Sequence, residues 1–157
     1  MASSTDNSIH VDAPVELVWR TMNDVRRWPS LFTEYASIEV LHEEGTTVRF
    51  RLTMVPDPDG TVWSWVSERT WDDETRTSRA HRVETGPFEY MRIYWDFRPE
   101  GEGTLMRWRQ EFEAKPTAPF TDEEITKRLN DNTAIQQAVI KEKIERIALG
   151  GAEIGRT

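Results

Sequence analysis

The hydrophobic positions follow a helical period at first and then change to a period of two. After a short strand at residues 7–11, Asp12 and Pro14 are typical of a helix start, as an N-cap and a first-turn residue. The apolar residues that follow are three or four positions apart, which predicts one buried helix face. They are Val15, Val18, Trp19, Met22 and Val25. A second, short helix is predicted over residues 30–36, with Leu31, Phe32, Glu34 and Tyr35 on it.

From residue 38 onward, apolar and polar residues alternate, which is typical of strands with one buried face. The predicted strands span residues 38–42, 48–55, 62–69, 76–84, 89–98 and 104–115. Turn-forming residues separate them, most clearly at 56–60. The outer faces are charged, whereas the inner faces carry Trp, Met and Phe. We therefore predict an antiparallel sheet with one face in water and the other face covered.

A long C-terminal helix is predicted to cover this sheet. Residues 121–124 form a capping-box sequence, and the helical period continues to about Gly150. At 1.5 Å per residue the helix is roughly 40 Å long, enough to cross a small sheet. Its apolar stripe consists of Ile125, Leu129, Ile140, Ile144 and Ile147.

Two polar residues, Asn132 and Gln136, interrupt the middle of that stripe. Buried polar groups need hydrogen-bond partners, and two interpretations are open. The two side chains bond to ordered water or strand backbone, or they line a cavity opposite the sheet. We favour the cavity, because the facing strand also becomes polar where the two elements would meet.

The stretch 62–69 has the most unusual inner face of the predicted sheet. That face carries Trp63, Trp65, Ser67 and Arg69. A solid core would place aliphatic residues there, because burying an unpaired charge is costly. An aromatic-walled cavity tolerates such a row, so we predict that Arg69 points into one and binds oxygen atoms of a ligand. The alternative is a solvent-facing arginine that a bulge turns outward.

The composition fits this picture and narrows the function classes. The 157 residues suit one domain, 1–157, with a frayed tail at 152–157. Seven Trp and six Phe within a hydrophobic fraction of 37% suit a shell around a hollow. The net charge of −8 argues against nucleic acid or an anionic membrane as the main partner.

Several common sites and signals are missing from the sequence. It has no cysteine, no apolar run of membrane-spanning length and no signal-peptide features at its start. We therefore expect a cytoplasmic protein without disulfides. The three histidines lack metal-ligand spacing and no phosphate-binding glycine loop occurs, so neither a metal nor another cofactor is expected.

Several stretches resemble the single-domain aromatase/cyclases of bacterial type II polyketide synthases. The resemblance rests on residues 5–8, 28–35, 63–69, 79–91 and 106–112, and RAHRVETGPF within the fourth stretch is the most specific. The order of elements is similar to the helix-grip fold of START and Bet v 1-type proteins. The resemblance implies an α+β fold, in which a curved antiparallel sheet wraps around the long C-terminal helix and encloses a deep pocket.

The resemblance also implies an activity. Members of this family take a poly-β-ketone from an acyl carrier protein, in a synthase that also contains a ketosynthase/chain-length factor pair. They close a ring by regiospecific aldol chemistry, here expected between carbons 9 and 14 with a second ring possible, and promote dehydrative aromatisation without a cofactor. Two other functions stay open: a non-catalytic START-like carrier of an aromatic or lipid ligand, and a subunit that only organises a synthase.

By this resemblance, Arg69 and Tyr35 are the catalytic candidates. A fixed guanidinium at Arg69 would stabilise the negative charge that develops on oxygen during the aldol step. The Tyr35 phenol would move a proton, although without the resemblance an aromatic residue with a solvated hydroxyl is the simpler interpretation. Glu34 is a candidate base or an exposed residue. Because neighbours on a helix point in different directions, we do not expect both Glu34 and Tyr35 to be catalytic.

The remaining candidates are expected to bind substrate. Ser67 and Gln110 would position carbonyl groups, and Arg82 would reach the pocket unless it pairs with Glu84. The predicted walls are Trp28, Phe32, Trp65, Phe88, Met91, Trp95 and Trp108. Trp63, Asn132 and Gln136 would complete the lining. The walls would confine the reactive chain in one bent conformation, which favours one pair of carbons over the others.

Overall fold

The structure, a computed structural model, describes residues 3–150. Its strands form one antiparallel sheet in the order β1-β7-β6-β5-β4-β3-β2. They are β1 (Ser3–Val11), β2 (Tyr35–Glu44), β3 (Thr47–Met54), β4 (Ser64–Asp72), β5 (Thr77–Arg82), β6 (Phe88–Glu100) and β7 (Gly103–Ala114). The helices are α1 (Val15–Asn23), the 3-10 turn η1 (Val25–Arg27), α2 (Trp28–Leu31) and α3 (Asp122–Ala148). The predicted frayed tail, 152–157, lies outside the described residues.

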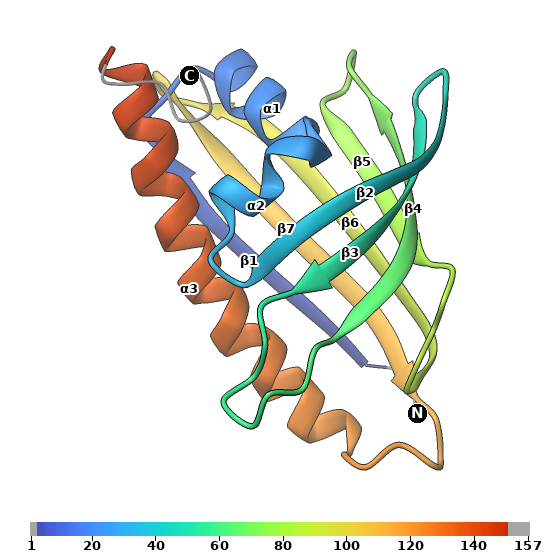
Figure 1. The fold of residues 1–157 in the computed structure, drawn as a ribbon. Helices are drawn as coiled ribbons and strands as arrows, with labels where there is room; N and C mark the ends of the chain where they lie inside the picture. The colour runs from blue at the N-terminus through green and yellow to red at the C-terminus, as the bar shows by residue number, and fades with distance from the viewer. Residues whose placement is uncertain (1–2, 151–157) are drawn as a thin grey trace.

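The elements are arranged as a helix grip. Figure 1 shows a curved sheet with α3 running along β1, and with α1 and α2 lying across the concave side. The predicted α+β fold with a long C-terminal helix is confirmed. Within residues 3–150, no helix combines the length and apolar character needed to cross a membrane.

The start of α3 follows directly from its sequence. The Thr121 hydroxyl accepts a hydrogen bond from the Glu124 backbone N–H at 3.1 Å, and the Glu124 carboxylate accepts one from the Thr121 N–H at 2.9 Å. This reciprocal pair satisfies two backbone donors that the first helical turn leaves free. The predicted capping box is therefore confirmed, and the helix ends at Ala148, close to the predicted Gly150.

The predicted short helix at 30–36 is wrong. Helix α2 begins earlier, at Trp28, with Pro29 in its first turn, and ends at Leu31, after which Phe32 is extended. The Thr33 backbone N–H donates to the Gln136 side chain of α3 at 2.9 Å, so it is not available for another helical turn. Tyr35 is consequently the first residue of β2, where it pairs with Met54 of β3.

The predicted strand at 62–69 is displaced by two residues at its start, because β4 runs from Ser64 to Asp72. The inner face of β4 is otherwise as predicted, since Ser67 and Arg69 are buried and Trp65 is half-buried. On β6 the predicted inner face is present, with Met91, Trp95 and Phe97 buried, although Asp96 on the opposite face is buried as well. Strand faces were thus predicted better than strand ends.

The core lies between the concave face of the sheet and the helices. Its larger part joins side chains of β3, β6 and β7 to those of α1, α2 and α3. These include Phe50, Trp95, Met106, Trp108, Trp19, Met22, Leu31, Ile140 and Ile144. A smaller cluster of Phe88, Met91, Phe112 and Ile125 lies where β6 and β7 meet the first turns of α3. The candidate site residues are distributed over both clusters.

Candidate active site in the aromatic interior

Arg69 lies inside the protein, on the concave face of β4. Its side chain is 2% exposed, so the prediction that it points inward is confirmed. Its cross-strand neighbours are Val48 of β3 and Ala80 of β5, both uncharged. Burial lowers the pKa of Arg69 to about 9, because the low-dielectric interior disfavours the charged guanidinium.

The guanidinium of Arg69 is only partly satisfied. Its Nη1 donates to the Asn23 side-chain oxygen, at the last residue of α1. The carbon at the centre of the guanidinium lies 5.8 Å from the Trp28 ring centroid and 5.4 Å from that of Trp95. Its Nη2 is buried and has no hydrogen-bond partner among the described residues. One N–H group of a buried cation therefore lacks an acceptor.

The aromatic residues predicted as walls contact one another. Trp95 stacks on Trp108 with ring centroids 4.9 Å apart. Phe32 stacks on Tyr35 at 4.4 Å and on Trp108 at 5.7 Å. Trp28 is held in place by its indole N–H, which donates to the Met22 carbonyl oxygen at 2.9 Å. The sequence had suggested that these rings surround an open space. In this conformation they pack against one another, and neither hollow described below for residues 3–150 is lined by them.

A second buried donor belongs to this aromatic cluster. The indole Nε1 of Trp108 is buried and has no partner among residues 3–150. Because Trp95 contacts both Arg69 and Trp108, the two unsatisfied donors belong to neighbouring side chains. Buried N–H groups without acceptors are rare in folded proteins, and each suggests a missing partner.

Tyr35 is a phenol that keeps its proton at neutral pH and can give it only to a stronger base, such as an alkoxide. Burial raises the pKa of its phenol well above the ordinary value, and the nearby Glu34 carboxylate raises it further. The phenol is thus protonated at neutral pH. Burial also raises the pKa of Glu34, although Arg128 opposes this effect. Tyr35 and Arg69 both contact Trp28, whose ring centroid is 6.1 Å from that of Tyr35.

Arg82 forms a second cationic group on the concave face, on β5. Its guanidinium carbon lies 4.1 Å from the Trp65 ring centroid and 5.2 Å from that of Phe88. Its Nη1 donates to the Thr85 carbonyl oxygen at 3.2 Å. Burial lowers the pKa of Arg82 to about 10. The Glu84 charge opposes this lowering, but the Glu84 carboxylate pairs with Arg51 at 2.9 Å and, among residues 3–150, forms no ion pair with Arg82, so that alternative is wrong.

Ser67 and Gln110 lie on the inner strand faces. Ser67 is buried and stands opposite Arg82 in the β4–β5 register. Gln110 stands opposite Ile93, and its side-chain oxygen accepts a hydrogen bond from the Thr5 hydroxyl at 3.1 Å. Phe88 and Met91 belong to the smaller core cluster, apart from Trp95 and Trp108. The predicted set is therefore divided into an Arg69 group and an Arg82 group.

Three predicted positions need correction. Trp63 precedes β4 and is 38% exposed, because its indole N–H donates to the Asp57 carboxylate of the adjacent loop at 2.8 Å. Gln136 bonds to the backbone N–H and hydroxyl of Thr33, in the loop between α2 and β2, so its amide is paired with a loop residue, which neither interpretation had named. Asn132 lies in the wall of a charged hollow on α3, together with Lys127, Arg128 and Asp131. It does not contribute to the surroundings of Arg69.

Asn23 is the residue that the sequence reasoning missed. It stands four positions after Trp19, next to the apolar stripe of α1, and a polar residue at such a position needs a partner. That spacing was the available signal. The partner itself is on β4 and could not be identified from the local pattern.

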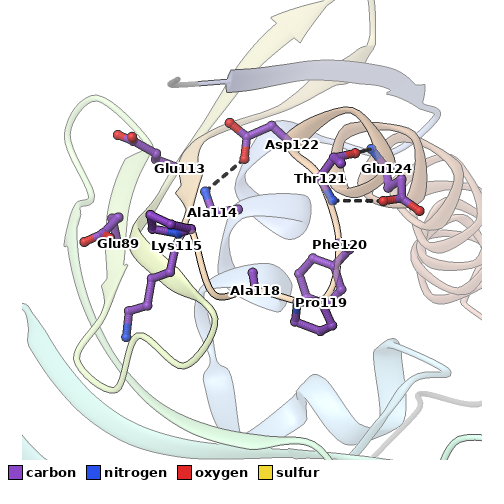
Figure 2. A pocket seen from close by; sticks show the side chains of 11 residues that line it. Glu89, Glu113, Ala114, Lys115, Ala118, Pro119, Phe120, Thr121, Asp122 and Glu124 are labelled. Atoms are coloured by element: carbon purple, nitrogen blue, oxygen red, sulfur yellow. Dashed lines mark hydrogen bonds between the residues drawn. The ribbon is translucent and has the colours of Figure 1, made fainter.

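A cavity of about 730 Å³ lies at the N-terminal end of α3 (Figure 2). Its lining includes Glu89, Asp122 and Glu124, with Lys115 and the ring of Phe120. The Asp122 carboxylate accepts a hydrogen bond from the Ala114 backbone N–H at 2.9 Å. Acidic residues outnumber basic ones in this lining, which does not favour an enolate or alkoxide. Arg69 and Tyr35 are not part of this lining, so the cavity is separate from the aromatic site.

Comparison with known proteins identifies the family. The family described as polyketide cyclase / dehydrase and lipid transport matches residues 11–134. A Streptomyces cyaneus protein named "Putative polyketide cyclase" is 55% identical over 148 residues, which cover 94% of this chain and 97% of that protein. The actinorhodin polyketide synthase bifunctional cyclase/dehydratase of Streptomyces coelicolor is 26% identical over 141 residues, covering 89% of this chain and 43% of that protein.

Solved structures agree on the fold. The crystal structure of the Zhui aromatase/cyclase from a Streptomyces species superposes with a TM-score of 0.83 at 22% identity, covering 97% of this chain and 100% of that one. A START superfamily protein from Mycobacterium smegmatis superposes with a TM-score of 0.74 at 16% identity, covering 92% and 98% of the two chains. By sequence and by fold, this chain belongs to the polyketide cyclase/dehydrase family.

Proposed function

We propose that this protein is a cofactor-independent polyketide aromatase/cyclase of a type II polyketide synthase. Its substrate would be a poly-β-ketone delivered by an acyl carrier protein after assembly by a ketosynthase/chain-length factor pair. It would close the first ring between carbons 9 and 14, with a second ring possible, and promote loss of water. Family membership and the chemistry of the aromatic interior support this proposal.

The unpaired Nη2 of Arg69 is the observation that carries the proposal. Burying a cation is costly, and leaving one of its N–H groups without an acceptor adds to that cost. A ketone, enolate or alkoxide oxygen of the substrate would supply the missing acceptor. Because the negative charge on that oxygen grows during the reaction, the interaction would be strongest in the transition state, which is the condition for rate acceleration.

The reaction can be written with the groups present. A methylene between two carbonyl groups of the substrate loses a proton to a base, and the resulting enolate carbon attacks a ketone further along the chain. A carbon–carbon bond forms, and the attacked ketone oxygen becomes an alkoxide near Arg69. Tyr35, with its raised pKa, would give its proton to that alkoxide and recover one from the base or from water. Loss of water from the alcohol, followed by enolisation of the remaining ring ketones, then yields the aromatic ring.

Substrate binding requires the packed rings to separate. Phe32 is the best candidate to move, because it lies between α2 and β2 and belongs to neither element. Its ring contacts Tyr35 and Trp108, so its displacement would expose the phenol and an indole N–H together. A flat polyketide ring could then stack where the Phe32 ring now lies.

A passive carrier function is the second candidate, because the family description includes lipid transport. The two functions predict different results in a synthase reconstituted from a ketosynthase pair, a carrier protein and this chain. Loss of one charge-stabilising donor typically lowers a rate by about 10²–10³. Arg69→Ala should therefore shift the products toward misfolded shunt polyketides. Arg79→Ala, which removes an exposed arginine of β5, is the matched control.

An unchanged product profile for folded Arg69→Ala would contradict the cyclase proposal and favour the carrier. A redirected profile that also occurs with Arg79→Ala would point to a general loss of positive charge and would equally contradict it. Circular dichroism and thermal unfolding of each variant establish whether the fold is intact.

A further inference from the structure

We infer that Asn23 is a positioning residue for Arg69, whose neutral amide fixes the guanidinium without neutralising its charge. This inference rests on the proposed function, because it concerns how Arg69 is prepared to bind substrate oxygen. It assigns a role in ring closure to a residue on α1, a helix that carries none of the other candidates.

The contact is specific and joins distant parts of the chain. The Asn23 side-chain oxygen accepts from Nη1 of Arg69, and the two residues are 46 positions apart. Asn23 ends α1, and the Trp28 indole N–H bonds to the Met22 carbonyl oxygen immediately before it. The end of α1 is therefore anchored, and it holds one side of the guanidinium while Nη2 stays available.

The guanidinium contacts uncharged groups, which are the Asn23 amide from α1 and the rings of Trp28 and Trp95. The cross-strand neighbours of Arg69, Val48 and Ala80, are uncharged as well. Within residues 3–150, Arg69 forms no ion pair with a carboxylate. By contrast, Arg49, Arg51 and Arg107 each pair with one. A carboxylate at position 23 would form a stronger hydrogen bond but would also cancel the positive charge.

The isosteric variant Asn23→Asp separates positioning from simple stabilisation. A hydrogen-bond acceptor of the same shape is retained, and the partner becomes charged, so we expect the unfolding temperature to equal or exceed that of the unchanged protein. The rate of correct ring closure should nevertheless fall by about tenfold or more, because less positive charge is left for the substrate oxygen. If Asn23 is merely structural, Asn23→Asp should be as active as the unchanged protein.

Two further variants complete the experiment. Asn23→Ala leaves Nη1 without its acceptor, so both the unfolding temperature and the rate should fall. Asn130→Asp is the matched control: the Asn130 oxygen accepts from the Asn7 amide at 2.9 Å, between α3 and β1, so a carboxylate is introduced at an acceptor that does not contact Arg69. We expect its product profile to match that of the unchanged protein.

The outcomes are distinguishable when Arg69→Ala is measured in parallel. If Arg69→Ala leaves the products unchanged, the proposed function fails. If Arg69→Ala redirects the products but Asn23→Asp is fully active, only the role of Asn23 is overturned. Should Asn23→Asp fail to fold, Asn23→Gln decides: its neutral amide must restore part of the rate lost in Asn23→Ala, and no restoration overturns the inference.

Discussion

Replacing Gln136 by alanine tests how firmly the segment with Phe32 and Tyr35 is attached to α3. The buried Gln136 side chain accepts from the Thr33 backbone N–H at 2.9 Å and donates to the Thr33 hydroxyl at 2.8 Å. These two bonds fix residue 33 immediately after Phe32. Their loss should loosen the segment that is proposed to move when substrate binds.

The expected loss of stability can be worked out from these contacts. A hydrogen bond contributes a net of about 0.5–1.5 kcal/mol, and a larger penalty applies when a lost partner leaves a group buried. Thr33 is exposed, so water can replace the glutamine amide and the larger penalty does not apply. We therefore expect Gln136→Ala to lower the free energy of unfolding by about 1–3 kcal/mol from the two hydrogen bonds alone. This corresponds to roughly 3–9 °C in unfolding temperature for a chain of this size.

Gln137→Ala provides the matched control. Gln137 is also buried on α3, but its amide makes one bond, to the Asn7 carbonyl oxygen of β1 at 3.1 Å. Both variants lose the same atoms, so the difference between their unfolding free energies compares the paired contact with Thr33 with the single bond to Asn7. Urea unfolding should show the larger loss for Gln136→Ala. In the reconstituted synthase, Gln136→Ala alone should increase the fraction of shunt products.

Two results would refute this reasoning. Equal unfolding free energies for the two variants would show that the paired contact with Thr33 contributes no more than a single bond. An unchanged product distribution in a measurably destabilised Gln136→Ala protein would show that the position of the segment 32–35 does not control ring closure.

Three further predictions concern other parts of the molecule. Phe32→Leu removes ring contacts with Tyr35 and Trp108, so we expect the free energy of unfolding to fall by about 1–3 kcal/mol. We also expect a polyphenol to bind faster, as measured by tryptophan fluorescence. An unchanged association rate would show that this ring does not obstruct binding. Thr121→Ala removes the helix cap of α3 and should cost about 1 kcal/mol in a thermal unfolding measurement, whereas Thr121→Ser should cost far less. The hydrogen bond from Arg107 lowers the pKa of Asp6 below its ordinary value of 3.8. The contribution of this pair to folding stability is therefore fully present above that pH and is lost as the pH falls through the lower folded-state pKa. Asp6→Asn should make acid unfolding less steep in that range, and identical acid transitions would contradict this assignment.

The sequence predicted those features that depend on local pattern. The alternation on β4 and β6 identified the inward-facing side chains, because successive residues of a strand point to opposite faces whatever the rest of the fold does. The cap at Thr121 was predictable for the same reason, since its partner Glu124 is three residues away. Arg69 was identified as an inward-facing residue from such a pattern.

The features that the sequence did not predict depend on distant contacts. The end of α2 and the extended conformation of Phe32 are linked to Gln136, which is 103 positions from Thr33. Trp63 was assigned to the concave face because the alternation includes it, but a carboxylate in the preceding loop binds its indole outside the sheet. Local periodicity carries no information about either partner.

How the aromatic side chains pack in the interior also could not be predicted from the sequence. Large aromatic side chains can surround a cavity or fill it, and the choice depends on the summed volume of groups from several strands and helices. Here the ring of Phe32 contacts Tyr35 and Trp108 in the space where the substrate is proposed to bind. The composition therefore predicted which residues form the interior, but it could not predict how they pack in the absence of a ligand.

The charge balance of the chain makes the surroundings of Arg69 informative. With 28 acidic against 20 basic residues, carboxylates are abundant, and surface arginines such as Arg49 and Arg51 pair with them. Arg69 is buried, where a charge without a counter-ion is costly, and yet its hydrogen-bond partner is the neutral Asn23. Stability of the folded chain does not account for this arrangement. An oxygen that gains negative charge during a reaction does account for it, because that oxygen requires a fixed cation whose charge has not already been neutralised.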